Sequence, residues 1–292
     1  MCIRDREDVV VSHVKDSSTL IARKPNPDDI TSYIEEELID ALCCYSAVNQ
    51  GQLNQTIVNA VITHLSKEKL PTVPRSIRHK YMAAFLIAAT GITGMDRVVP
   101  KVAGVEAPEL MFKLSRRWGY RVKGIPKDKA IVVAAKGNFH GRSMMAISLS
   151  DDPAAFEDFG PKIPGIELVE YNNIDAIRSL FEEKGDRIAS YLVEPIQGEG
   201  GDNYFRSEFL QGLRRLCDER EALLIFDEVQ TGFVGTGLWW DFLHHGMTPD
   251  ILVFGKKTQV CGIAAGKRMD EVDSVFHTSS RMSSTFSGNL VD

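Results

Sequence analysis

Two stretches near the end of the chain decide its fold: Ala222-Leu-Leu-Ile-Phe-Asp227 and Ile251-Leu-Val-Phe-Gly-Lys256. Each is a short apolar run that stops at a charged residue. Runs this short and this apolar are typical of strands buried on both faces of a parallel sheet. Residues 131–135 and 191–193 form two further runs of this kind. The sequence therefore predicts strands of one buried sheet.

Amphipathic stretches of helical length separate these runs. They cover about residues 174–183 and 207–221, and in the second Phe209, Leu213 and Leu216 recur on one helical face. Because strands and helices alternate, we expect an α/β domain with a mainly parallel sheet, helices on both faces and right-handed crossovers.

Three charged residues follow the predicted strands. They are Glu194, Asp227 and Lys256, and ligands of such sheets bind beyond the carboxyl ends of the strands. A buried Asp227 needs a cationic partner, and a protonated pyridinium nitrogen is one. Taken alone, the aspartate is better explained as a cap of the next helix or turn, and a lysine at this place as a surface residue. The context Asp227-Glu-Val-Gln-Thr-Gly232 reverses this preference for the aspartate.

The lysine is followed by a rival, Lys257. Consecutive residues of a strand point to opposite faces, so only one of the two can reach a site at the sheet edge. The placement of catalytic residues directly after strands favours Lys256 as the nucleophile.

A phosphate needs a helix that begins with open backbone N–H groups. Residues 103–107, Ala-Gly-Val-Glu-Ala, open a helical stretch that ends near Trp118-Gly119, with Pro108 in its first turn. The glycine-rich stretches 198–201 and 231–237 lack the spacing of a dinucleotide fingerprint or a Walker motif.

Composition narrows the class of protein. Of the 292 residues 43% are hydrophobic and 25% charged, as in soluble globular proteins, and the net charge of −6 argues against a nucleic-acid surface. The apolar run 82–89 is too short to span a membrane. The five cysteines show no metal-ligand spacing, so we expect reduced thiols, a cytoplasmic location and no metal.

Residues 1–40 are polar and weakly patterned, and we assign them to a separate N-terminal segment. Residues 1–6 fit no element and resemble translated adapter sequence, so they are left out of the fold prediction. Residues 41–292 form the large domain, which we expect to be incomplete at its C-terminal end.

From Tyr45 onward the chain resembles the class III aminotransferases that depend on pyridoxal 5′-phosphate (PLP), in particular the ornithine δ- and lysine ε-aminotransferases. The resemblance rests on motifs that occur in family order: Tyr45-Ser-Ala-Val-Asn-Gln-Gly51, Gly104-Val-Glu-Ala107, Gly137-Asn-Phe-His-Gly-Arg142, Glu194-Pro-Ile-Gln-Gly-Glu199, Asp227-Glu-Val-Gln-Thr-Gly232, Gly255-Lys256 and Ser284-Thr-Phe-Ser-Gly-Asn289.

The resemblance implies fold type I and a set of contacts to PLP. Lys256 would hold PLP as a Schiff base, and Asp227 would pair with its pyridinium nitrogen. The remaining cofactor contacts would come from Gly104 and Val105 to the phosphate, Phe139 to the ring face, Gln230 to the phenolic oxygen, and Thr285 to the phosphate of a neighbouring subunit. The last contact implies a homodimer.

The resemblance also implies a substrate. Tyr45 and Arg142 would bind the α-carboxylate end of L-ornithine or L-lysine, with Glu194 nearby and Glu199 as a gate paired with a C-terminal arginine. The terminal amino group would pass through PLP to 2-oxoglutarate, which gives a semialdehyde and glutamate.

Three departures from the family pattern stand out. Val102 and Ala103 replace small polar residues, Val234-Gly235 stands where an arginine is usual, and the chain stops at Asp292, before the C-terminal small domain. The first half looks more like the ornithine enzymes and the second more like the lysine enzymes. The alternatives are a non-catalytic fragment that binds PLP weakly or only dimerises, and an aminomutase or racemase that uses the same lysine.

Overall fold

The structure, a computed structural model, describes residues 10–74, 77–272 and 282–290, which fall into two compact units. The first unit extends to Pro71 and the second from Thr72 to Leu290. Residues 1–6 lie outside the described part, and the boundary expected at residue 40 falls within the first unit.

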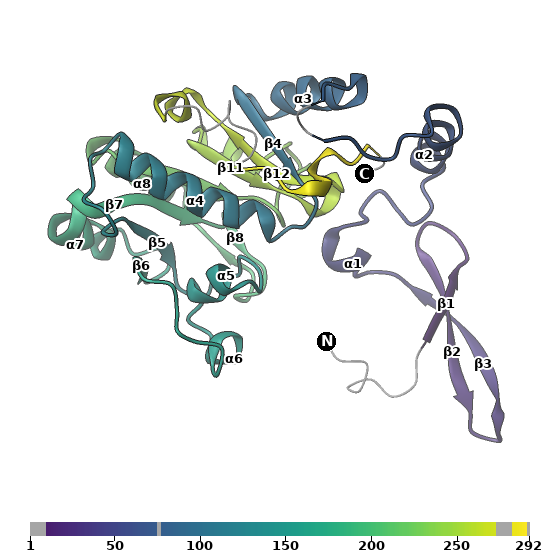
Figure 1. Ribbon diagram of the computed structural model, residues 1–292. Coiled ribbons are helices and arrows are strands. Elements are labelled where there is room, and N and C mark those ends of the chain that lie inside the picture. Colours follow the sequence, from purple (N-terminus) through teal and green to yellow (C-terminus); the bar gives the residue numbers. More distant parts are fainter. Residues whose placement is uncertain (1–9, 75–76, 273–281, 291–292) are drawn as a thin grey trace. The chain divides into compact units, whose positions relative to one another are not determined.

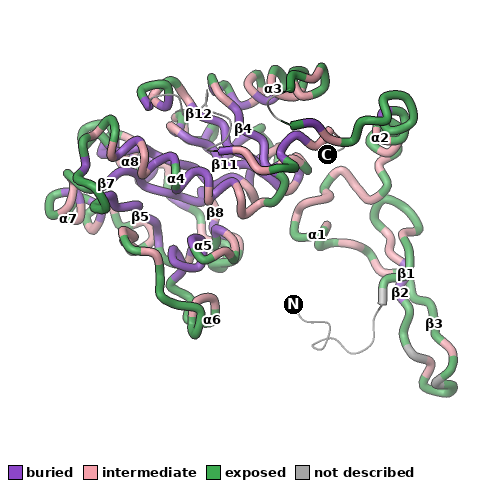
Figure 2. Tube along the Cα trace, in the orientation of Figure 1, coloured by how far each residue is buried: buried purple, intermediate pink, exposed green. Residues whose placement is uncertain are grey.

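The first unit carries a three-stranded antiparallel sheet followed by two helices. Its elements are β1 (Val10–Val14), β2 (Thr19–Asn26), β3 (Asp29–Ile39), α1 (Cys43–Ser46) and α2 (Gln55–Glu68). Figure 2 shows that most of this unit is exposed. Ion pairs such as Arg23–Glu35 join neighbouring strands across an exposed face. In strands that carry so many charged residues the apolar runs are short and isolated, such as Leu20-Ile-Ala22 in β2, which is why the segment looked weakly patterned.

A seven-stranded sheet forms the centre of the second unit, in the order β4-β12-β11-β10-β7-β5-β6. The strands from β11 to β6 are parallel, whereas β12 pairs antiparallel with both β11 and β4. The strands are β4 (Arg97–Lys101), β5 (Ile131–Ala135), β6 (Ile166–Val169), β7 (Ile188–Val193), β10 (Leu223–Asp227), β11 (Ile251–Phe254) and β12 (Cys261–Ala265).

Helices cover both faces of this sheet (Figure 1). They are α3 (Lys80–Thr93), α4 (Glu106–Arg121), α5 (Met144–Ser148), α7 (Ile174–Lys184) and α8 (Ser207–Glu219). A further short helix, α6 (Pro153–Phe156), has no buried residue and lies outside these layers (Figure 1). Shorter elements complete the unit: β8 (Ile196–Gln197), β9 (Asn203–Tyr204) and the 3-10 turns η2 (Gly185–Arg187), η3 (Asp241–His245), η4 (Lys256–Thr258), η5 (Lys267–Glu271) and η7 (Thr285–Gly288).

Alternate residues of each strand face different helices. In β5, Val132 and Ala134 belong to the core cluster that includes α4 and α5, whereas Val133 and Ala135 belong to the one that includes α7 and α8. Both faces of the strand are therefore buried, which confirms the expected mainly parallel α/β sheet between helices.

Three strands of this sheet, β4, β6 and β12, were not expected from the sequence. β4 contains Pro100 and ends on a lysine, and β12 consists mostly of small residues around Gly262. A Cβ at Gly262 would lie 2.4 Å from the Val99 carbonyl oxygen, so this strand depends on close backbone approach and not on large apolar side chains. As a result, Lys256 lies in the connection between β11 and β12 and not beyond the last strand.

Within residues 10–74, 77–272 and 282–290, no helix has both the length and the apolar composition to span a membrane.

Candidate active site

The carboxyl ends of β5, β7, β10 and β11 lead into four titratable side chains: His140, Glu194, Asp227 and Lys256. Because these strands are parallel neighbours, their ends lie at one edge of the sheet. The predicted convergence of Glu194, Asp227 and Lys256 at this edge agrees with the strand order, and we call it the carboxyl edge.

Asp227 is the last residue of β10 and lies opposite Val253 of β11. Its side chain is almost fully buried, and its Oδ2 lies 2.7 Å from Nδ1 of His140, while its Oδ1 accepts the Val229 amide at 3.2 Å. Burial lowers the pKa of His140, but the hydrogen bond to Asp227 and the charge of Glu194 outweigh it and raise that pKa overall. The imidazole is therefore a suitable counter-ion for the aspartate.

The other ring nitrogen of His140 is also buried, and no described residue bonds to its Nε2. This histidine belongs to a motif quoted from the sequence, but no role was predicted for it. Its position next to Phe139, a predicted cofactor contact, indicated that it could lie near the site. Only the fold shows that it contacts Asp227.

Glu194 follows β7 and is 8% exposed. Its Oε2 accepts the Phe139 amide at 2.8 Å. Burial raises the pKa of Glu194 to about 7, with a further rise from Asp227 and opposing effects of His140 and Lys256. The carboxyl group thus anchors the loop that carries Phe139 and can change its protonation near neutral pH.

Phe139 and Arg142 lie on this loop. The Phe139 ring is 38% exposed, and the Arg142 guanidinium lies 5.5 Å from its centroid. An exposed aromatic ring next to a buried polar cluster leaves a face for a flat ligand.

The two lysines diverge as expected, but for a different reason. They lie in the 3-10 turn η4, where Lys256 has a left-handed φ of 55°, and not on an alternating strand. Lys256 is partly exposed and donates to Oε1 of Gln230, whereas Lys257 is buried and donates to the Gln230 carbonyl oxygen.

Helix α4 begins beside the loop of Phe139 and Arg142. A Cβ at Gly141, whose φ is 115°, would lie 2.6 Å from a methyl carbon of Val105, so only glycine permits this approach. The Glu106 carboxylate accepts the amides of Val102 and Ala103, both at 3.0 Å. In the described residues nothing accepts the amides of Gly104 and Val105, which can therefore bind an anion.

The remaining predicted residues lie on the surface. Thr285 is exposed at the start of η7, and Glu199 is exposed in the turn between β8 and β9. This hairpin is fixed to the carboxyl edge, because a Cβ at Gly200 would lie 2.3 Å from the Gly137 carbonyl oxygen. Tyr45 lies in the first unit, half exposed, and its role stays a prediction.

The carboxyl edge fits PLP in three respects. Asp227 can hold a protonated ring nitrogen, the Gly104 and Val105 amides suit a phosphate, and Lys256 offers a primary amine. The described part of the chain holds no cluster of His, Cys, Asp or Glu suited to a metal ion.

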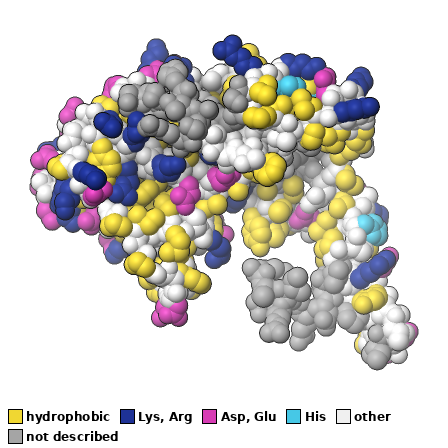
Figure 3. Space-filling model, in the orientation of Figure 1, with side chains coloured by type: hydrophobic (Ala, Val, Ile, Leu, Met, Phe, Trp, Pro, Cys, Tyr) yellow, Lys and Arg dark blue, Asp and Glu magenta, His cyan; other side chains and the backbone are white. Residues whose placement is uncertain are grey.

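A hollow with a volume of about 930 Å³ lies elsewhere, beside α4. Apolar residues such as Phe112 and Met145 line it, together with basic residues such as Lys113 and Arg117. Figure 3 shows basic side chains among apolar ones on the face that carries α4. None of the predicted site residues lines this hollow, so we do not assign it to the site.

Comparison with known proteins agrees with the geometry. The family described as Aminotransferase class-III matches residues 14–292. An ornithine aminotransferase of Emericella nidulans is 41% identical over 226 residues, which are 75% of this chain and 49% of that protein. One from Oceanobacillus iheyensis is 40% identical and covers 86% of this chain and 62% of its own length. The chain thus spans about half to three-fifths of these relatives.

Solved structures show the same likeness. An ornithine aminotransferase from Toxoplasma gondii with PLP at its active site has a TM-score of 0.85 and 30% identity, and covers 97% of this chain and 63% of its own. A lysine aminotransferase from M. tuberculosis has a TM-score of 0.85 and 31% identity, and covers 100% and 71%. Fold, motifs and relatives together show that the chain belongs to the PLP-dependent class III aminotransferases.

Proposed function

We propose that this chain provides the PLP-binding part of an aminotransferase that moves the terminal amino group of L-ornithine or L-lysine to 2-oxoglutarate in the cytoplasm. The observation that carries the proposal is the carboxyl edge, where the buried Asp227–His140 pair and the Lys256–Gln230 contact stand on neighbouring strand ends.

Each residue of this edge has a task that its surroundings support. Asp227, backed by His140, would keep a proton on the ring nitrogen, and the amides of Gly104 and Val105 would hold the phosphate. When bound, PLP supplies the electron sink that stabilises negative charge on a substrate carbon. Nζ of Lys256 would hold the cofactor covalently, and would then accept and return a proton as a free amine.

Substrate recognition would involve residues around this edge. Arg142 is exposed beside Phe139, which suits it to bind a carboxylate. Tyr45 would bind the α-carboxylate end of the donor, and Thr285 would reach the phosphate of a second subunit in a homodimer. Glu194 and Glu199 would lie near the amino donor, with Glu199 acting as a gate. Relatives named for ornithine and for lysine support both donors.

A second candidate function is a fragment that binds PLP weakly without turnover, or only dimerises. One observation favours it: Glu106 already occupies the Val102 and Ala103 amides next to the phosphate site.

A trapping experiment tests whether Lys256 holds PLP, which the active enzyme requires and a fragment that only dimerises lacks. We expect PLP followed by borohydride to add a reduced cofactor to the peptide containing Lys256, in the parent chain and in Lys257→Ala but not in Lys256→Ala. A Lys257 adduct would overturn the lysine assignment, and no adduct at all would favour the non-catalytic fragment.

The donor is identified in the same sample. We expect either L-ornithine or L-lysine to bleach the visible absorbance of the loaded chain, and 2-oxoglutarate to restore it. Turnover without 2-oxoglutarate would instead indicate an aminomutase or racemase.

A further inference from the structure

Lys257 is a buried lysine that the proposed reaction does not use. It is 7% exposed, and its Nζ donates to the Gln230 carbonyl oxygen at 2.5 Å. Burial, and after it the charge of Lys256, lower its pKa, while Glu228 acts in the opposite direction. Burying an ammonium group costs free energy, and the bond to the Gln230 carbonyl oxygen offsets part of that cost. We therefore asked what this buried lysine does for Gln230.

The space for this ammonium group exists because residue 235 is a glycine. A Cβ at Gly235 would lie 3.0 Å from Nζ of Lys257 and 3.2 Å from its Cε. The side chain of Lys257 therefore packs against bare backbone, at one of the positions where the resemblance led us to expect an arginine. The cation in this region is contributed by Lys257 from the turn after β11.

Lys257 contacts the N-terminal end of a loop, residues 228–242, whose two ends are held together by other contacts. The buried Glu228 carboxyl accepts the amides of Asp241 and Phe242 at 2.6 and 3.0 Å. A Cβ at Gly232 would lie 2.5 Å from the Trp240 ring, so the two ends of this loop are packed against each other. The contact to the Gln230 carbonyl ties the N-terminal end to η4.

Gln230 is thus held by two consecutive lysines. Its backbone carbonyl accepts from Lys257, and its side-chain oxygen accepts from Lys256. A glutamine with a fixed backbone has fewer conformations to lose when its side chain is placed against a partner.

We propose that Lys257 is a positioning residue, which fixes the backbone of Gln230 so that the Gln230 side chain is directed onto Lys256. This role deepens the proposed function, because it concerns the preparation of the lysine that would hold PLP. Lys257 itself makes no contact with the reacting atoms in this scheme.

A double-mutant cycle in the PLP-free chain tests the proposal. The readout is the rate at which acetic anhydride modifies Lys256, measured by peptide mass spectrometry at pH 8. Gln230→Leu removes an acceptor that holds the Lys256 ammonium group, so we expect acetylation about threefold faster, as for one modest hydrogen bond. In a Lys257→Met background the same change is expected to alter the rate by less than about 1.5-fold, because Gln230 is no longer directed at Lys256.

Additivity would overturn the proposal: a threefold change in both backgrounds means that Lys257 only supports the fold. Lys129→Met, at an exposed lysine, is the matched control and should leave the threefold change intact. Circular dichroism checks folding, and Lys257→Leu replaces the methionine variant if that one does not fold. Because no PLP is present, failure of this cycle is distinct from failure of the trapping experiment.

Discussion

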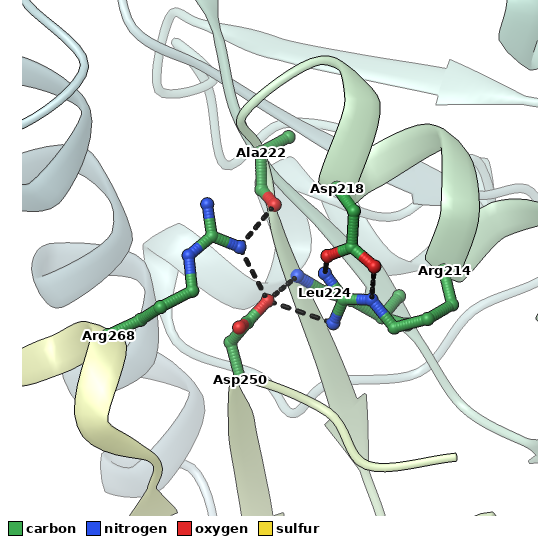
Figure 4. Close-up of polar contacts among 6 residues, drawn as sticks. All are labelled: Arg214, Asp218, Ala222, Leu224, Asp250 and Arg268. Atoms are coloured by element: carbon green, nitrogen blue, oxygen red, sulfur yellow. Dashed lines mark hydrogen bonds and ion pairs between the residues drawn. The ribbon is translucent and has the colours of Figure 1, made fainter. Parts of the chain in front are cut away.

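Asp227 and Asp250 lie at opposite edges of the same sheet and have different partners. Oδ2 of Asp250, directly before β11, accepts the Leu224 amide at 2.8 Å and the guanidinium groups of Arg214 and Arg268 at 3.0 and 3.2 Å (Figure 4). Asp227, at the end of β10, contacts a histidine and one amide.

Asp250 has partners suited to stabilising the fold, whereas Asp227 has partners suited to binding a ligand. Arginines stay charged at all relevant pH values, so the Asp250 cluster is a permanent tie between α8, β10, β11 and η5. At the carboxyl edge the partner of Asp227 is an imidazole, which can lose its charge, and His140 keeps a buried nitrogen without a partner among the described residues. The charges around Asp250 are therefore balanced within the chain, whereas the carboxyl edge around Asp227 can still bind a ligand.

The largest expected effect concerns Asp227. Asp227→Ala removes the anion that would keep a proton on the cofactor ring, so we expect turnover to fall by several orders of magnitude and PLP to bind at least about tenfold more weakly. Absorbance titration with PLP and steady-state rates measure both. Retained activity would mean that this aspartate is only a cap.

The matching change at the other edge should act on stability alone. Asp250→Ala removes the one acceptor shared by two guanidinium groups and the Leu224 amide, so we expect the free energy of unfolding to fall by about 3 kcal/mol. Urea denaturation measures this, and borohydride trapping on Lys256 should persist in the folded protein. Asp218→Ala, at the exposed partner of Arg214, is the control and should cost less than about 1 kcal/mol. Loss of trapping in folded Asp250→Ala would mean that Asp250 also affects the cofactor site, which contradicts the distinction between the two edges.

A smaller effect is expected in the pH dependence of stability. Because burial raises the pKa of Glu194 in the folded chain to about 7, from an ordinary value of 4.5, the folded chain binds a proton that the unfolded chain releases. The contribution of Glu194 to stability is therefore fully present below about pH 4.5 and is lost as the pH rises towards 7. Glu194→Gln should flatten this decline by on the order of 2 kcal/mol, as seen in denaturation at several pH values. An unchanged slope would show that Glu194 does not titrate there.

The smallest change tests how complete the Asp250 cluster is. Arg268→Met removes one of three donors to Asp250, a bond to the Ala222 carbonyl oxygen and a guanidinium placed 4.9 Å from the Trp118 ring centroid. Because Arg214 and the Leu224 amide remain, we expect a loss of only about 1 kcal/mol. A loss as large as that of Asp250→Ala would mean that Arg268 alone dominates the cluster.

The sequence was sufficient to predict which residues lie at the carboxyl edge, but not which of them contact one another. Apolar runs that end in Glu194, Asp227 and Lys256 place these residues at strand ends, and the parallel strand order brings them to one edge. No such rule connects His140 to Asp227, or Lys257 to Gln230, because those contacts depend on how irregular loops close. The same reason applies to Asp250, whose partners come from a helix and a 3-10 turn.

The hairpin of β8 and β9 has a consequence for how the proposed gate can be tested. Gly200 cannot accept a side chain without displacing the Gly137 backbone, whereas its neighbour Glu199 extends into solvent. The hairpin therefore keeps its position when the side chain at residue 199 is changed, whereas any residue larger than glycine at position 200 would push it away from the Gly137 backbone. Substitutions at position 199 thus test the proposed gate on an unchanged backbone.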